Sequence, residues 1–358
     1  METDKLIKII DGLKSPRELT RVRAMEDLMR IDDPAVVKEL FHMVRREGDY
    51  IKVQFCRFLG NFRGDEAVLP LAIFLASDSD KVAREAAAAL DTFSGEIKDN
   101  ALITFLRRVT PPFVKRYAIE ALGRERVAKA VPYLVDILQG HDRELKKLAI
   151  ESLRLIGDTM AIPYMAKRLG REDEEITYAL ILAIGELGGE EAAKAIGRFL
   201  GHEDPCLRRA AVWALYRLGC RRCIPQMVEM LVTDDDENVR EEIAKRIGAL
   251  AGASCVEPLL RAGYCDPASN VRAYAVWSIR NLPLGEIEGQ LLDLTENRDA
   301  CLRSGAILEL AQTGEARFLK VLERAAARDK SEEVRKCAHQ GCLILKKNAK
   351  GGGKLNES

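Results

Sequence analysis

The sequence carries little histidine, little tryptophan and no net charge. Its 358 residues include four histidines and two tryptophans, and 56 Lys and Arg residues balance 56 Asp and Glu residues. Because the charges balance, no global field steers the chain towards nucleic acid or an anionic membrane. No apolar run approaches the roughly 20 residues of a membrane span, and the first residues lack the basic start and apolar run of a signal peptide.

Cysteine also forms no pattern that would cross-link the chain. Nine cysteines, an odd number, are scattered without the spacing of a disulfide framework. Strand-like alternation of apolar and polar residues is missing as well. These absences favour a reduced, soluble, cytoplasmic protein without β-sheet.

What the sequence does contain is one pattern repeated along its length. In residues 204–219, Asp204 suits a helix N-cap, Pro205 suits the first helical turn and Gly219 can end the helix. Apolar residues three or four apart fall on one face of this helix. We take Leu207 as the reference position of the pattern. Equivalent positions recur every 31 or 32 residues, at Thr20, Ile51, Val82, Val114, Leu145, Ile176, Leu207, Val239, Val271, Leu302 and Val334.

Each repeat is predicted to form two helices. In the seventh repeat they cover residues 190–200 and 205–218, with a turn between them. Four residues past the reference position alanine predominates, and a small side chain there lets neighbouring helices approach closely. Self-similarity at this period is typical of a solenoid, in which each unit packs only on its neighbours. The sequence therefore predicts an all-α solenoid of about eleven repeats over residues 1–347, followed by a disordered tail at 348–358.

A basic residue follows the reference position in nine of the eleven repeats. These residues are Arg21, Lys52, Lys115, Lys146, Arg208, Arg240, Arg272, Arg303 and Arg335. An aspartate usually lies just upstream, as in Asp49, Asp80, Asp142, Asp204, Asp236 and Asp299. Because each base recurs with an acid at a fixed offset, we interpret them as a ladder between repeats, in which the aspartate caps a helix and meets the neighbouring arginine. A row that follows the period is more typical of structure than of ligand binding.

The repeat resembles a known family. Its consensus, Asp-x-x-Leu/Val-Arg-x-x-Ala-x-x-x-Leu-x-x-Leu-Gly and then Ala-x-Pro-x-Leu-x-x-x-Leu, is similar to the HEAT-like repeat of the phycobilisome lyase class. Residues 130–138, 157–169 and 219–231 carry the second half clearly. The resemblance covers residues 4–347 and implies a right-handed α-solenoid whose second helices line the concave surface. Members of the broad family include scaffolds and adaptors, bilin lyase subunits, a DNA glycosylase group and the di-iron deoxyhypusine hydroxylases.

Enzymatic signatures are missing. The hydroxylases hold two irons with repeated His-Glu pairs, whereas this chain has one such pair, His202 and Glu203, in a predicted turn. A di-iron centre needs several converging ligands, so the sequence disfavours this activity. We also find no nucleophile with a base, no glycine-rich phosphate loop and no clustered carboxylates. The prediction is a protein without catalytic residues, metal or cofactor.

Three cysteines merit a separate interpretation. Cys220 and Cys223 form an isolated C-x-x-C motif, and no second pair or suitably spaced histidines complete a zinc site. Cys223 and Cys255 occupy a position at which other repeats have alanine, so we interpret both as small core residues. Cys220, in the turn between repeats, is the better candidate for a reactive thiol.

Basic residues gather locally in repeats three to five. This basic patch consists of Arg107, Arg108, Lys115, Arg116, Arg124 and Arg126. It allows nucleic-acid binding as one hypothesis, which the lack of overall basicity disfavours. Opposite charges four residues apart, as in Arg116 and Glu120, are instead typical of a solvated helix face.

The second helices of repeats six to nine carry aromatic and basic residues at positions predicted to be exposed, where earlier repeats are polar. Trp213 and Trp277, the two tryptophans, occupy the same position two repeats apart. Helices packed about 10 Å apart would place these rings roughly 20 Å apart on one surface, with Lys245 between them. Such a composition is typical of binding hot spots, although rings that fill gaps between helices are the alternative. The residues predicted to bind a partner are Tyr178, Leu182, Arg209, Trp213, Tyr216, Lys245, Trp277 and Arg280.

These features predict a non-catalytic scaffold or adaptor that binds a protein partner on its concave face. One alternative is a bilin-lyase-like subunit, which would present a tetrapyrrole such as phycocyanobilin to a client protein. A second alternative is nucleic-acid binding through the basic patch, which would weaken steeply with salt.

Overall fold

The computed structural model describes residues 3–62, 64–108 and 110–351, and these residues form helices and no strand. The first helices of the repeats are α1 (Thr3–Leu13), α3 (Pro34–Val44), α5 (Val68–Leu75), α7 (Glu96–Arg107), α9 (Val131–Ile137), α11 (Ile162–Arg168), α13 (Glu190–Gly197), α15 (Ile224–Thr233), α17 (Val256–Cys265), α19 (Leu284–Leu294) and α21 (Leu319–Arg328). The second helices are α2 (Glu18–Met29), α4 (Asp49–Asn61), α6 (Asp80–Leu90), α8 (Pro112–Arg124), α10 (Arg143–Ile156), α12 (Glu174–Leu187), α14 (Pro205–Arg217), α16 (Glu237–Ala251), α18 (Ser269–Arg280), α20 (Ala300–Gln312) and α22 (Glu332–Gly351). Short 3-10 helices join several of them: η1 (Asp65–Ala67), η2 (Ala128–Ala130), η3 (Thr159–Ala161), η4 (Arg198–Gly201), η5 (Arg221–Cys223), η6 (Gly252–Cys255) and η7 (Ala316–Phe318).

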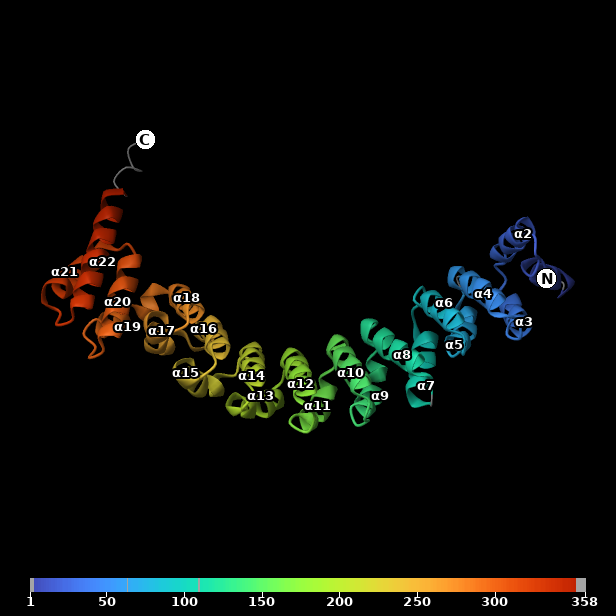
Figure 1. The fold of residues 1–358 in the computed structure, drawn as a ribbon, viewed down its shortest axis with the longest axis horizontal. Helices are drawn as coiled ribbons and strands as arrows, with labels where there is room; N and C mark the ends of the chain where they lie inside the picture. The colour runs from blue at the N-terminus through green and yellow to red at the C-terminus, as the bar shows by residue number, and fades with distance from the viewer. Residues whose placement is uncertain (1–2, 63, 109, 352–358) are drawn as a thin grey trace. The chain divides into compact units, whose positions relative to one another are not determined.

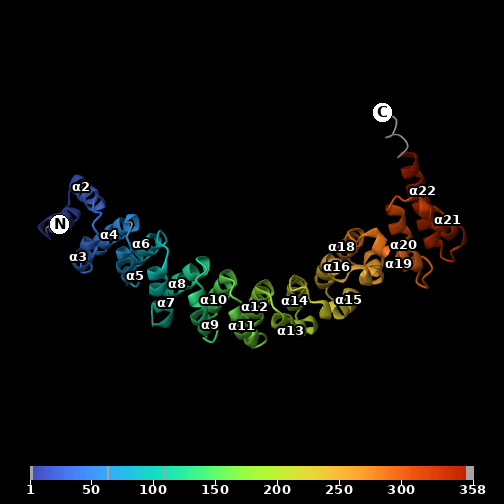
Figure 2. The same cartoon turned by 180° about the vertical axis from the view of Figure 1, so that it is seen from behind.

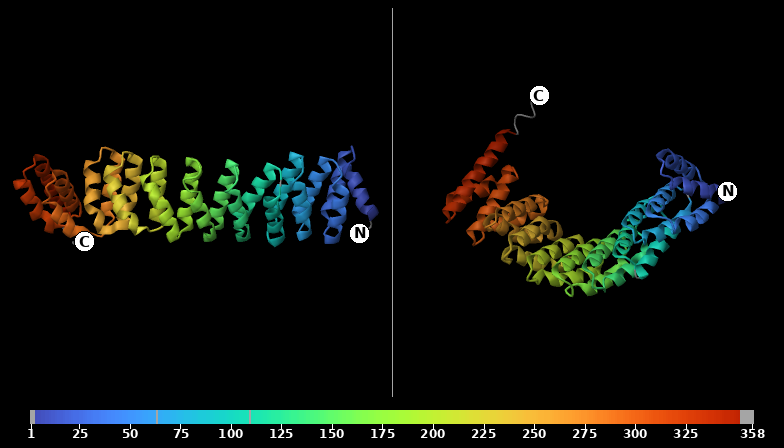
Figure 3. Two further views of the ribbon diagram at one scale, coloured as in Figure 1. Left: turned by 90° about the horizontal axis from the view of Figure 1, so that it is seen from below. Right: turned by 45° about the vertical axis from the view of Figure 1, so that its right-hand side comes forward.

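The prediction of an all-α solenoid is confirmed, and the helices of the described residues pair into the expected eleven repeats. The chain divides into two compact units, Met1–Arg168 (unit 1) and Leu169–Ser358 (unit 2). Within each unit the second helices lie along one side and the first helices along the other (Figures 1 and 2). Figure 3 shows that neighbouring repeats of a unit stack in chain order. The right-handed sense of the superhelix and a single array over residues 1–347 stay predictions.

The core of each unit consists of the apolar faces of the paired helices. Nine of the eleven reference residues are buried, whereas Thr20 is exposed and Leu145 is half-buried. In unit 1, aromatic rings add to this core: the ring centroids of Phe41 and Phe74 lie 5.4 Å apart, and those of Phe55 and Phe74 lie 6.2 Å apart. Edge-to-face pairs at such separations stabilise a core beyond the area that they bury.

Neighbouring second helices approach most closely through glycine. A Cβ atom on Gly185 of α12 would lie 2.6 Å from the Cβ atom of Ala214 on α14, so this position has no room for a larger side chain. The same register recurs in the pairs Gly60–Ala89, Gly123–Ser152 and Gly248–Ser278. These four pairs of second helices are therefore packed tightly along this row.

Helix capping follows the prediction in the later repeats. Asp204 accepts a hydrogen bond from the backbone N–H of Cys206 at 2.8 Å, and Gly219 after α14 adopts a positive φ of 63°. The predicted caps at Asp142, Asp236 and Asp299 are also present. The caps predicted at Asp49 and Asp80 are wrong. Their helices begin one residue earlier than expected, which places both carboxylates in the first turn, where they still meet the positive end of the helix dipole.

The C-terminal boundary lies later than predicted. Helix α22 continues to Gly351, because nothing after residue 347 interrupts the helix before the glycines at 351–353. The rest of the predicted tail, residues 352–358, lies outside the described residues. None of the helices in residues 3–62, 64–108 and 110–351 combines the length and the hydropathy that crossing a membrane requires.

Candidate functional site

Aromatic and basic side chains meet on three packed second helices of unit 2, α14, α16 and α18. The Nζ atom of Lys245 on α16 lies 4.2 Å from the ring centroid of Tyr274 on α18. The guanidinium of Arg246, also on α16, lies 5.1 Å from the ring centroid of Tyr216 on α14. Cations at these distances are attracted to the face of an aromatic ring. We call Trp213, Tyr216, Lys245, Tyr274 and Trp277 the aromatic surface.

The two tryptophans differ in their surroundings. Trp277 is 56% exposed, as predicted for a binding residue. Trp213 is half-buried, because its ring lies over Gly185 of α12, where an added Cβ atom would be 3.5 Å away. The guanidinium of Arg217 lies 5.9 Å from the Trp213 ring. Trp213 therefore fills a gap between helices in part, whereas Trp277 stands free for contact.

Two of the basic side chains predicted as binding residues already have acidic partners. Arg280 donates to the carboxylate of Glu309 at 2.8 Å, and Lys245 pairs with Glu241 on its own helix. Glu309 is buried and also accepts from the hydroxyl of Tyr264. Arg280 therefore neutralises a buried carboxylate while its side chain stays 49% exposed, and its contact with a partner stays a prediction. A buried charge requires such a partner to offset the loss of its hydration.

The remaining predicted binding residues, Tyr178, Leu182 and Arg209, are half-buried on α12 and α14. Sequence reasoning missed Tyr274, which is 38% exposed and lies three residues before Trp277 on α18. That spacing places both rings on one helix face and was the available signal. It also missed Arg246, whose role depends on contact with Tyr216 of a different repeat.

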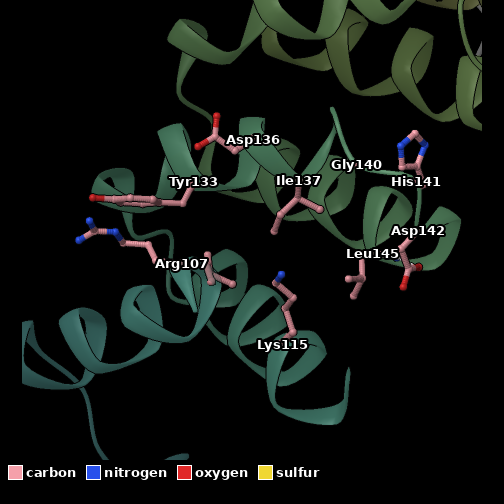
Figure 4. A pocket seen from close by; sticks show the side chains of 10 residues that line it. Arg107, Lys115, Tyr133, Asp136, Ile137, Gly140, His141, Asp142 and Leu145 are labelled. Carbon is pink, nitrogen blue, oxygen red and sulfur yellow. Dashed lines mark hydrogen bonds between the residues drawn. The ribbon is translucent and has the colours of Figure 1, made fainter. Parts of the chain in front are cut away.

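A second candidate region is a hollow of about 710 Å³ in unit 1 (Figure 4). Helices α7, α8, α9 and α10 contribute to it, with Leu106, Ile137 and Leu145 as apolar lining residues. The guanidinium of Arg107 lies 5.9 Å from the ring centroid of Tyr133 at one end of the hollow. A volume of this size is typical of ligand-binding clefts.

The structure separates the predicted basic patch into two ends of α8. Arg107 and Lys115 line the hollow, and Arg116 is exposed beside them. Arg124 lies at the other end of α8, roughly 13 Å away along the helix axis, and donates to Asp91 at 2.7 Å. The last two members, Arg108 and Arg126, lie in the turns after α7 and α8. Arg124 and Arg126 therefore lie at the far end of α8 from Lys115 and Arg116.

The predicted ladder between repeats is present in unit 2, but the acid differs from the predicted one. Three of the ladder arginines each bind the aspartate that ends the next first helix, 26 residues later, through two parallel hydrogen bonds, whereas Arg272 has an arginine, Arg298, at that distance. These pairs are Arg208–Asp234, Arg240–Asp266 and Arg303–Asp329, at 2.7 to 3.1 Å. The same arginines donate to backbone carbonyls five and six residues upstream. The capping aspartates Asp204 and Asp236 instead accept from backbone N–H groups of their own helices, as a cap requires.

The cysteines correct two expectations. Cys265 on α17 and Cys301 on α20 form a disulfide, with their Cα atoms 6.6 Å apart, where no disulfide was expected. Cys220 is buried, and its Sγ atom lies 2.7 Å from that of Cys223, while its reactivity stays a prediction. Burial, together with the contact to Cys220, raises the pKa of the Cys223 thiol to about 12. Cys255 is fully buried, as predicted, whereas Cys223 is half-buried.

A family model described as HEAT repeats matches residues 3–91, 100–180, 162–248, 198–280 and 256–341. Among solved structures, the chain is similar to Kap121p bound to Nup53p, with 12% identity, a TM-score of 0.54, and coverage of 99% of this chain and 47% of that one. It is also similar to importin beta, with 13% identity, a TM-score of 0.55, and coverage of 96% and 59%. The chain thus spans about half the length of these proteins, and the likeness shows the fold alone. No curated protein matches the chain.

Proposed function

Because the chain belongs to the HEAT-repeat family, we propose that it is a non-catalytic scaffold that binds a protein partner through its aromatic surface. The observation that carries this proposal is the exposed pair of rings on α18, Trp277 and Tyr274, beside Lys245 of α16. Large exposed rings cost hydration free energy unless a partner covers them, and they are the most frequent hot-spot residues of protein interfaces. Kap121p, which shares the fold, binds protein partners such as Nup53p and the SUMO protease Ulp1p in its solved complexes.

The test is native mass spectrometry of the full chain, purified gently from its own host. We expect one co-purifying protein of defined mass, whose complex survives Tyr164→Ala and is lost with Trp277→Ala. Tyr164 is a suitable control because it is an exposed aromatic residue of unit 1, outside the aromatic surface. Trp277→Ala should weaken binding by about 2 kcal/mol or more. Equal recovery of the partner with both variants would reject the aromatic surface as the binding site.

The finer parts of the hypothesis rest on the same measurement. Membership of the phycobilisome lyase class stays a prediction, and so does presentation of a bilin. Detection of a bound molecule with the mass of a bilin would favour this alternative over the scaffold. That the partner lies on a concave face is likewise a proposal. A cytoplasmic location stays a prediction too, and the Cys265–Cys301 disulfide weighs against a reducing compartment.

A further inference from the structure

The hollow of unit 1 lies where unit 2 has an ion pair of the ladder. In unit 2, Arg240 and Arg303 each bind the aspartate 26 residues later. All four side chains of these two pairs are more than nine-tenths buried. Lys115 occupies the arginine position in unit 1, and the residue 26 positions later is His141. Both line the hollow. The acid that would complete the pair is therefore missing from the chain.

Lys115 has no substitute partner. Within the part of the chain that the structure describes, its side chain forms no hydrogen bond and no ion pair. Its side chain is half-buried, and Figure 4 shows its amine directed from α8 into the hollow towards Ile137 of α9. A partly desolvated ammonium without a directly bonded acid favours the entry of a carboxylate or another anion.

The wall beside this amine is apolar. Leu145 is a reference residue, and the corresponding residue of the preceding repeat, Val114, is buried. Leu145 instead remains half-buried and lines the hollow with Ile137. Covering this apolar area with another apolar group is favourable, because it removes the area from water. The hollow thus combines one unpaired cation with an uncovered aliphatic wall.

We propose that this hollow binds an acidic and apolar segment of a protein. A Glu or Asp carboxylate of that segment bonds to Lys115 in place of the missing aspartate, and a neighbouring aliphatic side chain packs on Leu145 and Ile137. This binding is independent of the aromatic surface, which lies in unit 2.

The charges around the hollow favour a single carboxylate over a polyanion. Asp136 and Asp142 also line it, and their carboxylates balance the charges of Arg107 and Lys115. A nucleic-acid strand would bring several phosphates against these two acids, and each such contact is repulsive. Asp142 is further held as the cap of α10, where it accepts from the N–H of Leu145 at 3.0 Å. One carboxylate next to Lys115 avoids this repulsion.

The experiment uses the full chain with carbon-13 labelled histidine rings, because the chain has only four histidines and His141 lines the hollow. The probe is a capped peptide, Gly-Leu-Glu-Leu-Gly, and the control probe replaces Glu with Gln. The signal that disappears in His141→Asn identifies the ring of His141. We expect this signal to shift on titration with the Glu peptide. The Gln peptide should bind about tenfold more weakly, because it lacks the charge-assisted hydrogen bond.

Three variants locate the contact, and peptide binding to each is measured by saturation transfer from the protein to the peptide. Lys115→Met should weaken binding about tenfold, whereas Arg116→Met, which removes the next cation of α8, should change it less than about twofold. His141→Asp should weaken binding by no more than about tenfold in a chain that stays folded, because the new carboxylate pairs with Lys115 and competes with the peptide. Equal binding to Lys115→Met and the wild type, or an unmoved His141 signal, would overturn the proposal. A stronger shift with a single-stranded oligonucleotide would overturn it in favour of nucleic acid.

Discussion

The hollow around Lys115 in unit 1 and the hollows around Arg240 and Arg303 in unit 2 occupy the same place in their repeats. Their volumes are about 710, 480 and 770 Å³, so size does not distinguish them. The difference is chemical, because Arg240 and Arg303 in unit 2 are each paired with an aspartate of the chain, whereas Lys115 is not. A repeat protein can therefore keep one backbone and make a position structural in one repeat and available for binding in another.

The first helices of the two units also differ at the position five residues before the ladder aspartate. Asp136 stands in unit 1 where the first helices that end at Asp266 and Asp329 have Arg261 and Arg324, whereas the one that ends at Asp234 has Glu229. Arg261 donates to Asp299 at 2.9 Å, so the base at this position also serves the packing of unit 2. Compared with these two helices of unit 2, α9 of unit 1 and the turn after it therefore differ at both positions: His141 replaces the aspartate, and Asp136 replaces the arginine.

The largest expected effect is the loss of a closed pair. Arg303→Met should destabilise unit 2 by about 3 kcal/mol, because it leaves the Asp329 carboxylate buried without a partner and removes two hydrogen bonds to carbonyls. Hydrogen exchange of α20 and α21 measures this local stability. Lys330→Met, next to Asp329 but exposed, is the control. A change below about 1 kcal/mol would show that the pair is dispensable.

The period, the helices and most of the later caps could be predicted from the sequence, because each depends on residues within one repeat. The partner of each ladder arginine could not, since Asp234 and Asp236 are two residues apart and only the packed turn shows that Arg208 meets the first. The disulfide was missed for a similar reason. Cys265 and Cys301 come together because α17 packs on α20, a contact between different repeats.

The candidate sites were predicted in part for the same physical reason. The exposure of Trp277 follows from its position on one helix, whereas the burial of Trp213 depends on Gly185 of the preceding second helix. The hollow could not be found from the basic patch, because four of those six residues do not line it. Its signal, a histidine 26 residues after Lys115, has meaning only once the pairing distance of the ladder is known.

Lowering the pH should break the Arg–Asp pairs of unit 2. The loss of stability should be smaller than for Arg303→Met, because the hydrogen bonds from Arg303 to backbone carbonyls remain. The hydrogen bonds from Arg303 hold the pKa of Asp329 below its usual value. A carboxylate with a lowered pKa contributes stability that is present above the unfolded-state value of about 4 and lost as pH falls below it. We expect protection of α20 and α21 to fall in this range in the wild type, and less so in Asp329→Asn. Parallel loss in both proteins would contradict this assignment.

Closing the open hollow should give a modest gain. His141→Asp supplies the missing acid opposite Lys115 and should stabilise unit 1 by about 0.5 kcal/mol, since the pair is only partly buried. Exchange of the amides in α8 and α10 measures the change. The control is His141→Asn, because asparagine has nearly the same shape as aspartate but no charge. It should give no gain in stability. Adding Lys115→Arg to His141→Asp should raise the gain further, because a guanidinium can form two parallel hydrogen bonds as Arg240 does.

The smallest expected effect is the removal of the unpaired cation. Lys115→Met should change the stability of unit 1 by less than about 0.5 kcal/mol, because Lys115 has no partner to lose among the described residues. Arg240→Met, at the same position of a unit 2 repeat, should cost several times more, since it strands Asp266. Urea unfolding and exchange of both variants give the two values side by side. Comparable losses would mean that Lys115 holds its repeat together as Arg240 does, and that the hollow is part of the ladder after all.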